Sequence, residues 1–517
     1  MGLGKTYMSL VCLAEYMEQQ KLSGRTQKPV LVVAPLSLLE NWEDEVRHTF
    51  RESPFRDIVV LQAGRDLGRF RMPGAAREST QLAALLDTDG ILDGDAIRYA
   101  LTIGPDAGAG RLDLDRRLVL ATYQTLRDYQ FSLCRVDWGM VIFDEAQNIK
   151  NPNALQTRAA KGLKADFKLL ATGTPVENSL GDFWCLLDTA QPGILGGWSQ
   201  FRETWIKPIL SAADDERDQV RSRVGAGLRE AVGPFMLRRI KEDQLKGLPL
   251  KTIYSGVAEA PGGQQQYAPH LAVCIRGGQL EAYDAVLGDF RSRRGTEDMR
   301  GAALAALARL REISLHPRLR DESLLLCSSA AAARTIMSES GKLSVLLEVL
   351  EIIRRNGEKA LLFMVTKRLQ RALKIWLDQI YGLDIGIVNG DTAAVATKSE
   401  ELTRKQLITA FEAKPGFNLL IMSPVAAGVG LTVVGANHVV HLERHWNPAK
   451  EAQATDRVYR IGQTRDVHIH LPAVLHPQFD SFDVHLDRLL RGKMVLKDAV
   501  VTPETVNEGE LIKAMGL

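Results

Sequence analysis

The sequence contains few cysteines, and they lie far apart. Five occur among 517 residues, at Cys12, Cys134, Cys185, Cys274 and Cys327. No two of them are close enough in sequence to form the paired spacing of a zinc site. The odd count and the wide scatter favour a reducing compartment and a structural role for these thiols.

Long apolar runs are also missing. No run approaches the roughly 20 residues that a membrane-spanning helix needs. The N-terminus has no basic stretch followed by an apolar one, so no signal peptide is visible. We therefore expect a cytoplasmic protein with no membrane partner.

An excess of charge of either sign is absent as well. The chain has 65 basic and 63 acidic side chains, so net charge gives no argument for nucleic-acid binding and any basic surface must be local. Hydrophobic residues make up 45% and charged residues 25%, which is ordinary for a folded, soluble protein. A chain of 517 residues is too long for one core, so we expect two or more domains.

Short apolar segments that alternate with helical patterns are the main feature that is present. In the first third, buried strands are predicted at 30–34, 118–121, 140–143 and 168–171. Continuous apolar strands are typical of parallel sheets covered on both faces, and such sheets bind ligands beyond the carboxyl ends of their strands. The same pattern returns at 360–364, 385–388, 419–422 and 438–442, with helices expected at 367–380 and 397–411. We therefore predict a second α/β domain over about residues 340–475.

The remaining regions have other patterns. Residues 191–340 are largely helical in pattern, and 302–311 should form a strong helix because it is rich in Ala, Leu and Arg. Residues 64–117 contain many Gly and Asp, which we interpret as an insertion between strands. The last twenty residues have the composition of a weakly structured tail.

A phosphate-binding motif opens the chain. Gly2-Leu3-Gly4-Lys5-Thr6 matches the second half of a Gly-x-x-x-x-Gly-Lys-Ser/Thr loop. In such a loop the glycines let backbone N–H groups close on phosphate oxygens, the lysine reaches the β and γ phosphates, and the hydroxyl binds Mg²⁺. The simpler alternative is a Gly-rich start to a helix.

An acidic pair follows the apolar segment 140–143. A carboxylate at a strand end, here Asp144, can hold Mg²⁺, and its neighbour Glu145 can orient or deprotonate an attacking water. The alternative is an acidic helix start favoured by the helix dipole. The order of the two motifs, with the phosphate loop first, favours the nucleotide interpretation. Residues 172–175 follow the next strand, where they either couple the nucleotide site to a second surface or form a simple turn.

Two arginines near the C-terminus, Arg457 and Arg460, are three residues apart. On a helix they would share a face. An arginine delivered from a second domain can stabilise charge that develops on a γ-phosphate. The usual alternative is a solvated basic helix. A hydrolytic site completed only when two lobes close would also explain why there are two α/β domains.

Taken in order, these segments resemble the motifs of superfamily-two helicases, and specifically of the Swi/Snf family of ATP-driven DNA translocases. The matching segments are 1–6 (motif I), 33–42 (Ia), 121–125 (Ib), 144–147 (II), 171–178 (III), 235–239 with 248–249, 310–317, 340–343, 361–363 (IV), 423–431 (V), 446–448 and 453–463 (VI). The resemblance covers residues 1 to about 470. The Arg-Ile-Gly-Gln ending at 460–463 separates this family from the box-type RNA helicases.

The resemblance implies a role for each matching residue, with ATP and Mg²⁺ as ligands. Gly2, Gly4, Lys5 and Thr6 would bind the phosphates, and Thr6 would also contact Mg²⁺. Asp144 would hold Mg²⁺ and Glu145 would activate water, while Gln147 and motif III would link hydrolysis to DNA.

In the second domain, Gly430 and Gln453 would lie near the nucleotide, and Arg457 and Arg460 would complete the site, with Arg460 as the finger. Double-stranded DNA is the implied partner, contacted through its backbone. The residues expected to face the DNA are Ser37, Asn41, Thr122 and Trp446, although each could instead be a helix cap or a core residue.

The resemblance also implies an α/β fold of two RecA-like parallel-sheet lobes with largely helical insertions between them. The expected divisions are an ATP-binding lobe at 1–240, incomplete at its N-terminus, a helical inter-lobe region at 241–340, a C-terminal lobe at 341–475 and a C-terminal segment at 476–517. The family also has a strand and an acidic pair before motif I. We therefore expect the chain as written to fold poorly in its first lobe or to bind ATP weakly.

The predicted function is an ATP-dependent motor that translocates on double-stranded DNA. It would remodel or displace a bound protein, serve DNA repair or drive a defence system. A bacterial cytoplasm or nucleoid is favoured, because family insertions are modest and no chromatin-type accessory domain is visible. Two alternatives remain: a strand-separating DNA or RNA helicase, and an inactive DNA-binding scaffold.

Overall fold

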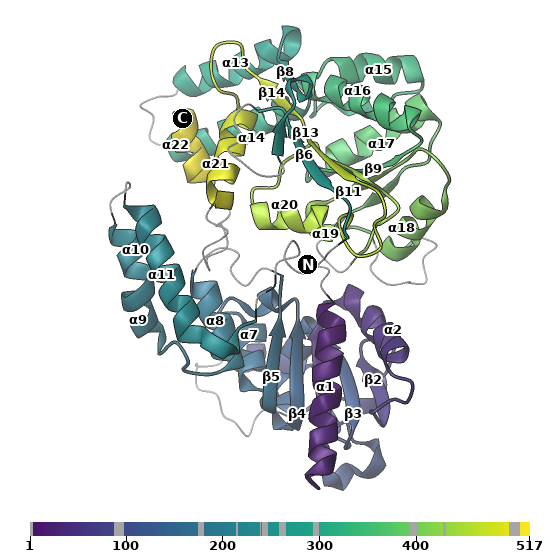
Figure 1. Ribbon diagram of the computed structural model, residues 1–517, viewed down its shortest axis with the longest axis vertical. Coiled ribbons are helices and arrows are strands. Elements are labelled where there is room, and N and C mark those ends of the chain that lie inside the picture. Colours follow the sequence, from purple (N-terminus) through teal and green to yellow (C-terminus); the bar gives the residue numbers. More distant parts are fainter. Residues whose placement is uncertain are drawn as a thin grey trace. The chain divides into compact units, whose positions relative to one another are not determined.

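Two parallel β-sheets organise the chain, one in each of two structural units (Figure 1). The computed structural model describes residues 4–86, 98–173, 180–212, 216–237, 239, 247–257, 265–292, 299–392, 402–427, 431–495 and 507–517. Lobe one comprises the described part of Leu3–Arg238, and lobe two comprises the described parts of Arg239–Asp498 and Pro503–Leu517. Within these residues, no helix is both long and apolar enough to cross a membrane.

The sheet of lobe one has five parallel strands in the order β2-β3-β1-β4-β5. They are β1 (Val30–Ala34), β2 (Asp57–Leu61), β3 (Arg117–Thr122), β4 (Asp137–Asp144) and β5 (Lys164–Ala171). The three central strands are buried along almost their whole length, as expected for apolar strands covered on both faces. All four strands predicted in this part of the sequence are confirmed, and β2 is an addition.

Helices cover both faces of this sheet. They are α1 (Lys5–Leu22), α2 (Leu39–Thr49), α5 (Tyr123–Asp128), α6 (Gln130–Arg135) and α7 (Leu155–Gly162). Helices α1 and α2 pack on the face that carries Val32, and α5, α6 and α7 pack on the face that carries Val33. The alternation of side chains along β1 therefore supplies both cores of the lobe.

The predicted insertion at 64–117 connects β2 to β3 and contains α3 (Leu67–Phe70), α4 (Glu78–Leu86) and a short 3₁₀ turn, η3 (Pro105–Gly110). Two charged side chains fasten it. The fully buried Glu78 carboxylate accepts hydrogen bonds from the backbone of Ala100 and Ser132. Arg117 forms a bidentate pair with Asp57 at 2.8 and 2.7 Å.

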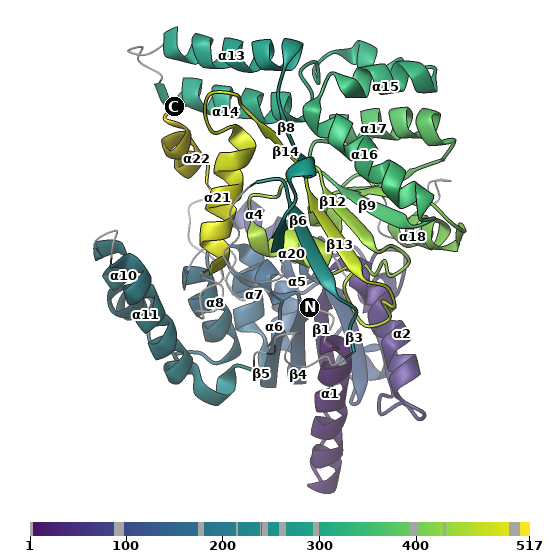
Figure 2. The same cartoon turned by 45° about the horizontal axis from the view of Figure 1, so that its top comes forward.

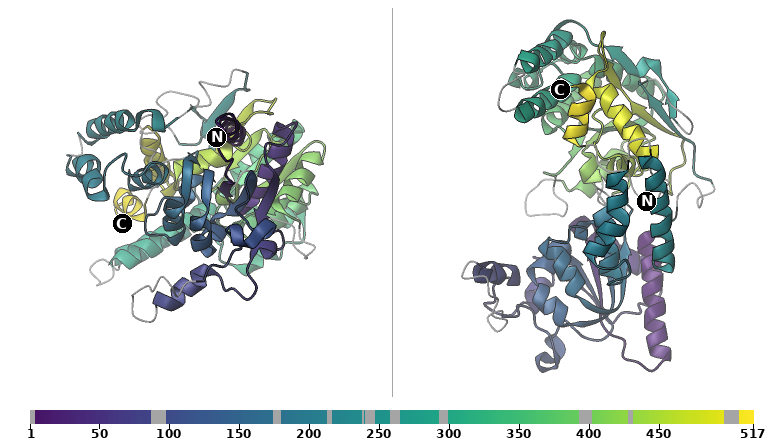
Figure 3. Two further views of the ribbon diagram at one scale, coloured as in Figure 1. Left: turned by 90° about the horizontal axis from the view of Figure 1, so that it is seen from below. Right: turned by 90° about the vertical axis from the view of Figure 1, so that its left-hand side faces the viewer.

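A helical extension follows the sheet of lobe one. It consists of α8 (Leu180–Ala190), α9 (Trp198–Phe201), a π-helical turn η5 (Arg202–Ile206), α10 (Lys207–Ser211) and α11 (Arg217–Val232). Helices α10 and α11 pack against each other (Figure 3). The π turn ends two residues before Pro208, whose ring would crowd the carbonyl four residues earlier in a regular helix.

The sheet of lobe two has seven parallel strands in the order β10-β11-β9-β12-β13-β6-β7. They are β6 (Lys251–Ser255), β7 (Gln265–Tyr267), β9 (Lys359–Phe363), β10 (Gly386–Val388), β11 (Asn418–Met422), β12 (His438–His441) and β13 (Val467–Leu471). A separate ladder joins β8 (Ala272–Cys274) to β14 (Ala473–Leu475). Strands β9 to β12 confirm the four strands expected from the second group of apolar segments.

Both faces of this second sheet are also covered (Figure 2). The covering helices are α15 (Ala330–Ser338), α16 (Gly341–Arg355), α17 (Lys367–Tyr381), α18 (Arg404–Ala413), α19 (Pro424–Ala427) and α20 (Pro448–Thr455). The first three pack on the face of Leu362, and the others pack on the face of Leu361. The chain thus repeats one α/β layout twice, as the two-lobed prediction requires.

The region at 241–340, expected to be helical, also contains strands. It holds α13 (Gly277–Ser292), α14 (Met299–Leu315) and α15, but β6 and β7 within it extend the sheet of lobe two. β6 pairs with β13, more than 200 residues away, at Ile253 and Ile469. The sequence of β6 is half polar, Lys-Thr-Ile-Tyr-Ser, so it lacks the continuous apolar run by which the other strands are recognised.

The expectation of a weakly structured tail is wrong for residues 507–517. Helix α22 (Glu508–Met515) begins with a capping box formed by Asn507 and Glu510. Its Leu511 is fully buried in a core shared with α13, α14 and α21 (Phe482–Val495). A helix of eight residues with one fully buried side chain gives little periodic signal, and its stability comes from that shared core.

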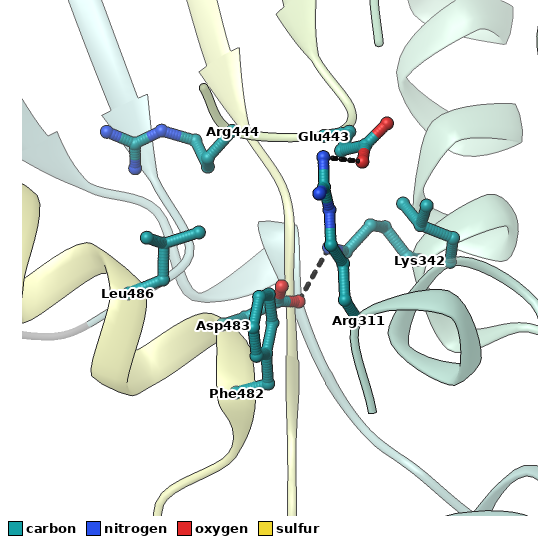
Figure 4. A pocket seen from close by; sticks show the side chains of 8 residues that line it. Arg311, Lys342, Glu443, Arg444, Phe482, Asp483 and Leu486 are labelled. Carbon is teal, nitrogen blue, oxygen red and sulfur yellow. Dashed lines mark ion pairs between the residues drawn. The ribbon is translucent and has the colours of Figure 1, made fainter. Parts of the chain in front are cut away.

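Three ion pairs surround a pocket of lobe two with space for about one water molecule, and two of them fasten α21 to the rest of the lobe (Figure 4). Lys342 at the start of α16 and Asp483 on α21 are 2.6 Å apart and almost fully buried. Arg311 on α14 pairs with Glu443 at 2.5 Å. Arg444 pairs with Asp487 of α21 at 2.6 Å. Because opposite charges are matched, these groups stabilise the lobe only while every partner is present.

We predict that Asp483→Asn lowers the free energy of unfolding by about 3 kcal/mol, because it leaves the buried Lys342 ammonium without its counter-ion. The matched control is Asp391→Asn. Lys367 and Asp391 are also 2.6 Å apart, but their side chains are 54% and 69% exposed. Solvent screens that pair, so the control should lose less than about 1 kcal/mol. Denaturant unfolding of both variants measures the difference, and equal losses would contradict the prediction.

Candidate active site

The carboxyl ends of the strands in lobe one lie at one edge of the sheet and carry the predicted site. Asp144 is the last residue of β4, and it is in register with Ala171, the last residue of β5. The first turn of α1 reaches the same edge, because the Lys5 amino group lies 3.8 Å from a carboxylate oxygen of Glu145. The structure therefore brings together the phosphate-loop lysine and the acidic pair, which are about 140 residues apart in sequence.

Lys5 lies at the start of α1, directly after Gly4. Gly4 has a left-handed backbone, with φ of 71°, a conformation that glycine adopts without the steric cost of a Cβ atom. The Lys5 Nζ atom is buried and makes no hydrogen bond to any part of the chain that the structure describes. The Glu145 carboxylate, at 3.8 Å, and the nearby charge of Asp144 partly balance the charge of Lys5. An ammonium group in this state is suited to receive anionic oxygens.

Asp144 is buried and held at both oxygens. Its Oδ1 accepts the backbone N–H of Glu145 at 2.9 Å, and its Oδ2 accepts the indole N–H of Trp42 at 3.0 Å. Burial raises the pKa of Asp144 above its ordinary value, and the charge of Glu145 raises it further. The charge of Lys5 and the hydrogen bond from Trp42 act in the opposite direction on this pKa.

Glu145 has a left-handed backbone, with φ of 51°, which is unusual for a residue with a side chain. Hydrogen bonds hold it there: its N–H donates to Asp144, and its carbonyl accepts the backbone N–H and the side-chain amide of Asn148. The Glu145 carboxylate accepts the amide of Gln147 at 2.8 Å, and the Gln147 oxygen accepts the hydroxyl of Thr172 at 2.8 Å. A continuous polar chain thus joins the acidic pair to the segment after β5.

The residues at this edge fit a magnesium ion bound together with a polyphosphate. No group of three or more His, Cys, Asp or Glu side chains among the described residues could hold a metal ion alone. Mg²⁺ in phosphoryl-transfer sites needs only one or two carboxylates, with substrate phosphates and water as its other ligands. A buried carboxylate such as Asp144, with the half-buried Thr6 beside Lys5 on α1, provides that kind of partial site.

Several predicted residues lie outside the described part of the chain. They are Gly2, Gly430 and residues 174–179, which include most of motif III.

In lobe two, the expected helix carrying Arg457 and Arg460 is wrong. Helix α20 ends at Thr455, and residues 456–462 form turns that pack against 431–436. A backbone N–H from Val433 is accepted by the carbonyl of Arg457, which fixes these turns. The Arg457 carbonyl is thus bonded outside a helix, and Gly462, with φ of 101°, has a conformation that no helix contains.

The two arginines have different surroundings. Arg457 is buried, and its guanidinium donates to the Leu431 carbonyl at 3.4 Å. Arg460 is half-buried and donates to the Thr432 hydroxyl at 2.6 Å. Burial lowers the pKa of Arg460, which nevertheless stays protonated at neutral pH. Gln453 is buried on α20.

The four residues expected to face DNA differ in exposure. Asn41 on α2 is exposed, and the buried Ser37 hydroxyl makes no hydrogen bond among the described residues. Thr122 caps α5 by accepting the Thr125 N–H, so its hydroxyl has a structural role. Trp446 lies under the guanidinium of Arg311, 5.4 Å from the ring centre. Contact with DNA remains a prediction for all four.

Sequence reasoning missed two direct partners of Asp144. Trp42 donates to its carboxylate, and the hydroxyl of Tyr123 donates to its backbone carbonyl at 2.8 Å. Both residues fall inside segments that resemble family motifs, but their contacts with β4 span 102 and 21 positions. A buried tryptophan or tyrosine usually finds a hydrogen-bond partner, and this is the signal that could have indicated them.

A lysine at a helix start, facing an acidic pair at the carboxyl edge of a parallel sheet, is the arrangement of a P-loop nucleotide hydrolase. Comparison with known proteins identifies the family of nucleotide hydrolases to which the chain belongs. Residues 1–319 match the SNF2-related domain, and residues 341–462 match the helicase conserved C-terminal domain. The chain belongs to the SNF2 family and is an ATP-hydrolysing enzyme of that family. The predicted Swi/Snf resemblance is thereby confirmed.

Three relatives illustrate the similarity. Zorya protein ZorD of Escherichia coli is 37% identical over 499 residues, which are 96% of this chain and 41% of ZorD. YwqA of Bacillus subtilis, provisionally named an ATP-dependent helicase/translocase, is 30% identical over 98% of this chain and 46% of YwqA. DNA repair and recombination protein RAD26 of Saccharomyces cerevisiae is 25% identical over 91% of this chain and 42% of RAD26. The chain thus spans less than half the length of each relative.

We predict that Glu145→Gln abolishes ATP hydrolysis but raises the thermal midpoint of the nucleotide-free protein by about 2 °C or more. The site holds two buried carboxylates and one lysine, so removal of one negative charge relieves repulsion. The contrasting control is Glu43→Gln, which breaks a bidentate pair with Arg65 at 3.1 and 2.9 Å and should lower the midpoint.

The gain in Glu145→Gln should depend on pH. Because the folded-state pKa of Asp144 is raised, its contribution to stability is complete below its unfolded pKa and is lost as pH rises through its folded pKa. Glu145 is one cause of the raised pKa, so its removal helps most where Asp144 is ionised. Calorimetry should therefore give a larger gain at neutral than at acidic pH, and a larger gain at acidic pH would contradict this account.

Proposed function

We propose that this chain uses ATP hydrolysis to translocate along double-stranded DNA, and that it displaces or remodels protein bound to that DNA. The observation that carries the proposal is the buried Lys5 amino group, which faces Glu145 and makes no hydrogen bond within the described residues. A buried charge without hydrogen bonds is costly. Triphosphate oxygens would supply the acceptors that Lys5 lacks.

Each residue at the edge of lobe one has a proposed role in hydrolysis. Lys5 binds the phosphates, and Asp144 with Thr6 holds Mg²⁺, which when bound neutralises phosphate charge. Glu145 orients and deprotonates the attacking water; its left-handed backbone and its bond from Gln147 fix the carboxylate in one position. Arg460 of lobe two is proposed to stabilise the charge of the transition state.

The polar chain from Glu145 through Gln147 to Thr172 is the proposed link between hydrolysis and movement. Its two hydrogen bonds are both 2.8 Å long, and both depend on the orientation of the single Gln147 amide. A displacement of the segment after β5 would therefore reorient the Gln147 amide and change its hydrogen bond to the water-activating Glu145 carboxylate. We propose that DNA engagement and hydrolysis communicate through this amide.

Double-stranded DNA is the proposed track. Asn41 on α2 offers an exposed, short polar side chain that can contact a phosphate backbone without reading bases. Contact by Ser37 would require its buried hydroxyl to become accessible. The name of RAD26, a DNA repair and recombination protein, supports a DNA partner, and the provisional name of YwqA, an ATP-dependent helicase/translocase, supports a motor function. Because ZorD and YwqA are bacterial, we propose that the protein acts in a bacterial cytoplasm or nucleoid.

ATP hydrolysis measured with and without duplex DNA tests this function. We expect DNA to stimulate hydrolysis, and Lys5→Ala to reduce the rate by about 10²-fold or more, because it removes a charge aimed at the phosphates. Lys21→Ala is the matched control, since Lys21 lies in the last turn of the same helix and is exposed. Arg460→Ala should also lower kcat, whereas the exposed Arg465→Ala, five residues away, should not.

Translocation itself is tested by triplex displacement. A motor that tracks along a duplex should release the third strand in an ATP-dependent manner and leave the plain duplex intact. Strand separation of the plain duplex would favour a helicase instead, and the absence of DNA-stimulated hydrolysis in the unsubstituted chain would contradict the motor.

A further inference from the structure

The strongest unassigned feature of the catalytic edge is the side chain of Trp42. It lies on α2, is almost fully buried, and donates its indole N–H to Asp144 Oδ2 at 3.0 Å. The other carboxylate oxygen accepts the backbone N–H of Glu145. The two oxygens of the Asp144 carboxylate are therefore held by two donors, one from its neighbour in sequence and one from a residue 102 positions away.

The geometry restricts what Asp144 can do. A carboxylate on a strand end can rotate about its side-chain bonds unless its oxygens are held. Two donors on separate oxygens fix the plane of the carboxylate and occupy one lone pair on each oxygen, and each oxygen keeps another for a metal or a water. The indole is rigid and packed among apolar side chains such as Leu38 and Ile142, so its N–H is aimed with little freedom.

Tyr123 adds a second support from the opposite face of the sheet. Its hydroxyl donates to the Asp144 carbonyl at 2.8 Å, and its ring packs in the core on that face. Trp42 packs in the core of the other face. The strand end is thus held between α2 and α5, with the side chain fixed from one side and the backbone from the other.

We propose that Trp42 is a positioning residue for the magnesium site: its indole N–H fixes the Asp144 carboxylate in the orientation that binds the metal of the nucleotide complex. Tyr123 assists by holding the Asp144 backbone. This inference rests on the proposed function, because it assigns Asp144 to the metal. Asn41 precedes Trp42 on α2 and is exposed. Helix α2 therefore has an exposed residue directly beside the residue that holds the Asp144 carboxylate.

The test compares Trp42→Phe with Trp138→Phe in the whole chain. Trp138 is the matched control, since it is fully buried in the same lobe and donates its indole N–H to the Leu133 carbonyl, also at 3.0 Å. Both substitutions remove one buried indole hydrogen bond and a similar volume. The measurement is the affinity for a fluorescent ATP analogue, titrated with Mg²⁺ and repeated in EDTA.

For Trp42→Phe, we expect the Mg²⁺ concentration for half-maximal binding to rise about tenfold, as is typical when an outer partner of a metal ligand is removed. Affinity in EDTA should stay at the wild-type value, and excess Mg²⁺ should recover most of kcat. Trp138→Phe should leave the Mg²⁺ requirement unchanged. Tyr123→Phe, which deletes one oxygen atom, should give a smaller shift in the same direction and serves if Trp42→Phe fails to fold.

An unchanged Mg²⁺ requirement in a folded Trp42→Phe protein would overturn the inference, and so would an equal shift in Trp138→Phe. Loss of affinity to the same degree in Mg²⁺ and in EDTA would also overturn it, because that result means a general packing role. If the wild-type chain binds no nucleotide under any condition, the proposed function fails instead, and the two failures are distinguishable.

Discussion

Two carboxylates and one lysine, buried together at the carboxyl edge of a parallel sheet, form the interaction on which the rest of lobe one depends. Asp144 and Glu145 carry more negative charge than Lys5 can balance, and little water reaches them. Such a cluster is costly in isolation and suited to bind a cation with a polyphosphate. The sheet, the start of α1 and the hydrogen bonds from α2 and α5 hold these groups in place despite that cost.

In lobe two, by contrast, the charged side chains around the pocket beside α21 are paired with partners of opposite sign. Lys342 with Asp483, and Arg311 with Glu443, are close pairs of opposite sign. These pairs connect segments that lie far apart in sequence, including α21, which follows the segment matched by the helicase domain. Balanced pairs contribute specificity to the packing of a lobe, whereas an unbalanced cluster marks the place where a ligand must complete the charge.

The strands and the main site residues could be predicted from the sequence because local patterns determine them. Continuous apolar runs indicated β1, β3, β4 and β5, and the motif order indicated that Lys5 would meet Asp144 and Glu145. The polar strand β6, helix α22 and the turn that carries Arg460 were missed, because partners distant in sequence stabilise them. The contact of Trp42 with Asp144 was missed for the same reason, since only tertiary packing brings α2 to the end of β4.

The structure of the Glu145→Gln variant with Mg²⁺ and ATP is the most direct test of the central claim, that the unbalanced charge cluster is the nucleotide site. We predict that phosphate oxygens lie within hydrogen-bond distance of Lys5 Nζ, and that Asp144 contacts the metal directly or through water. Nucleotide bound elsewhere, with Lys5 contacting only protein groups, would contradict the account.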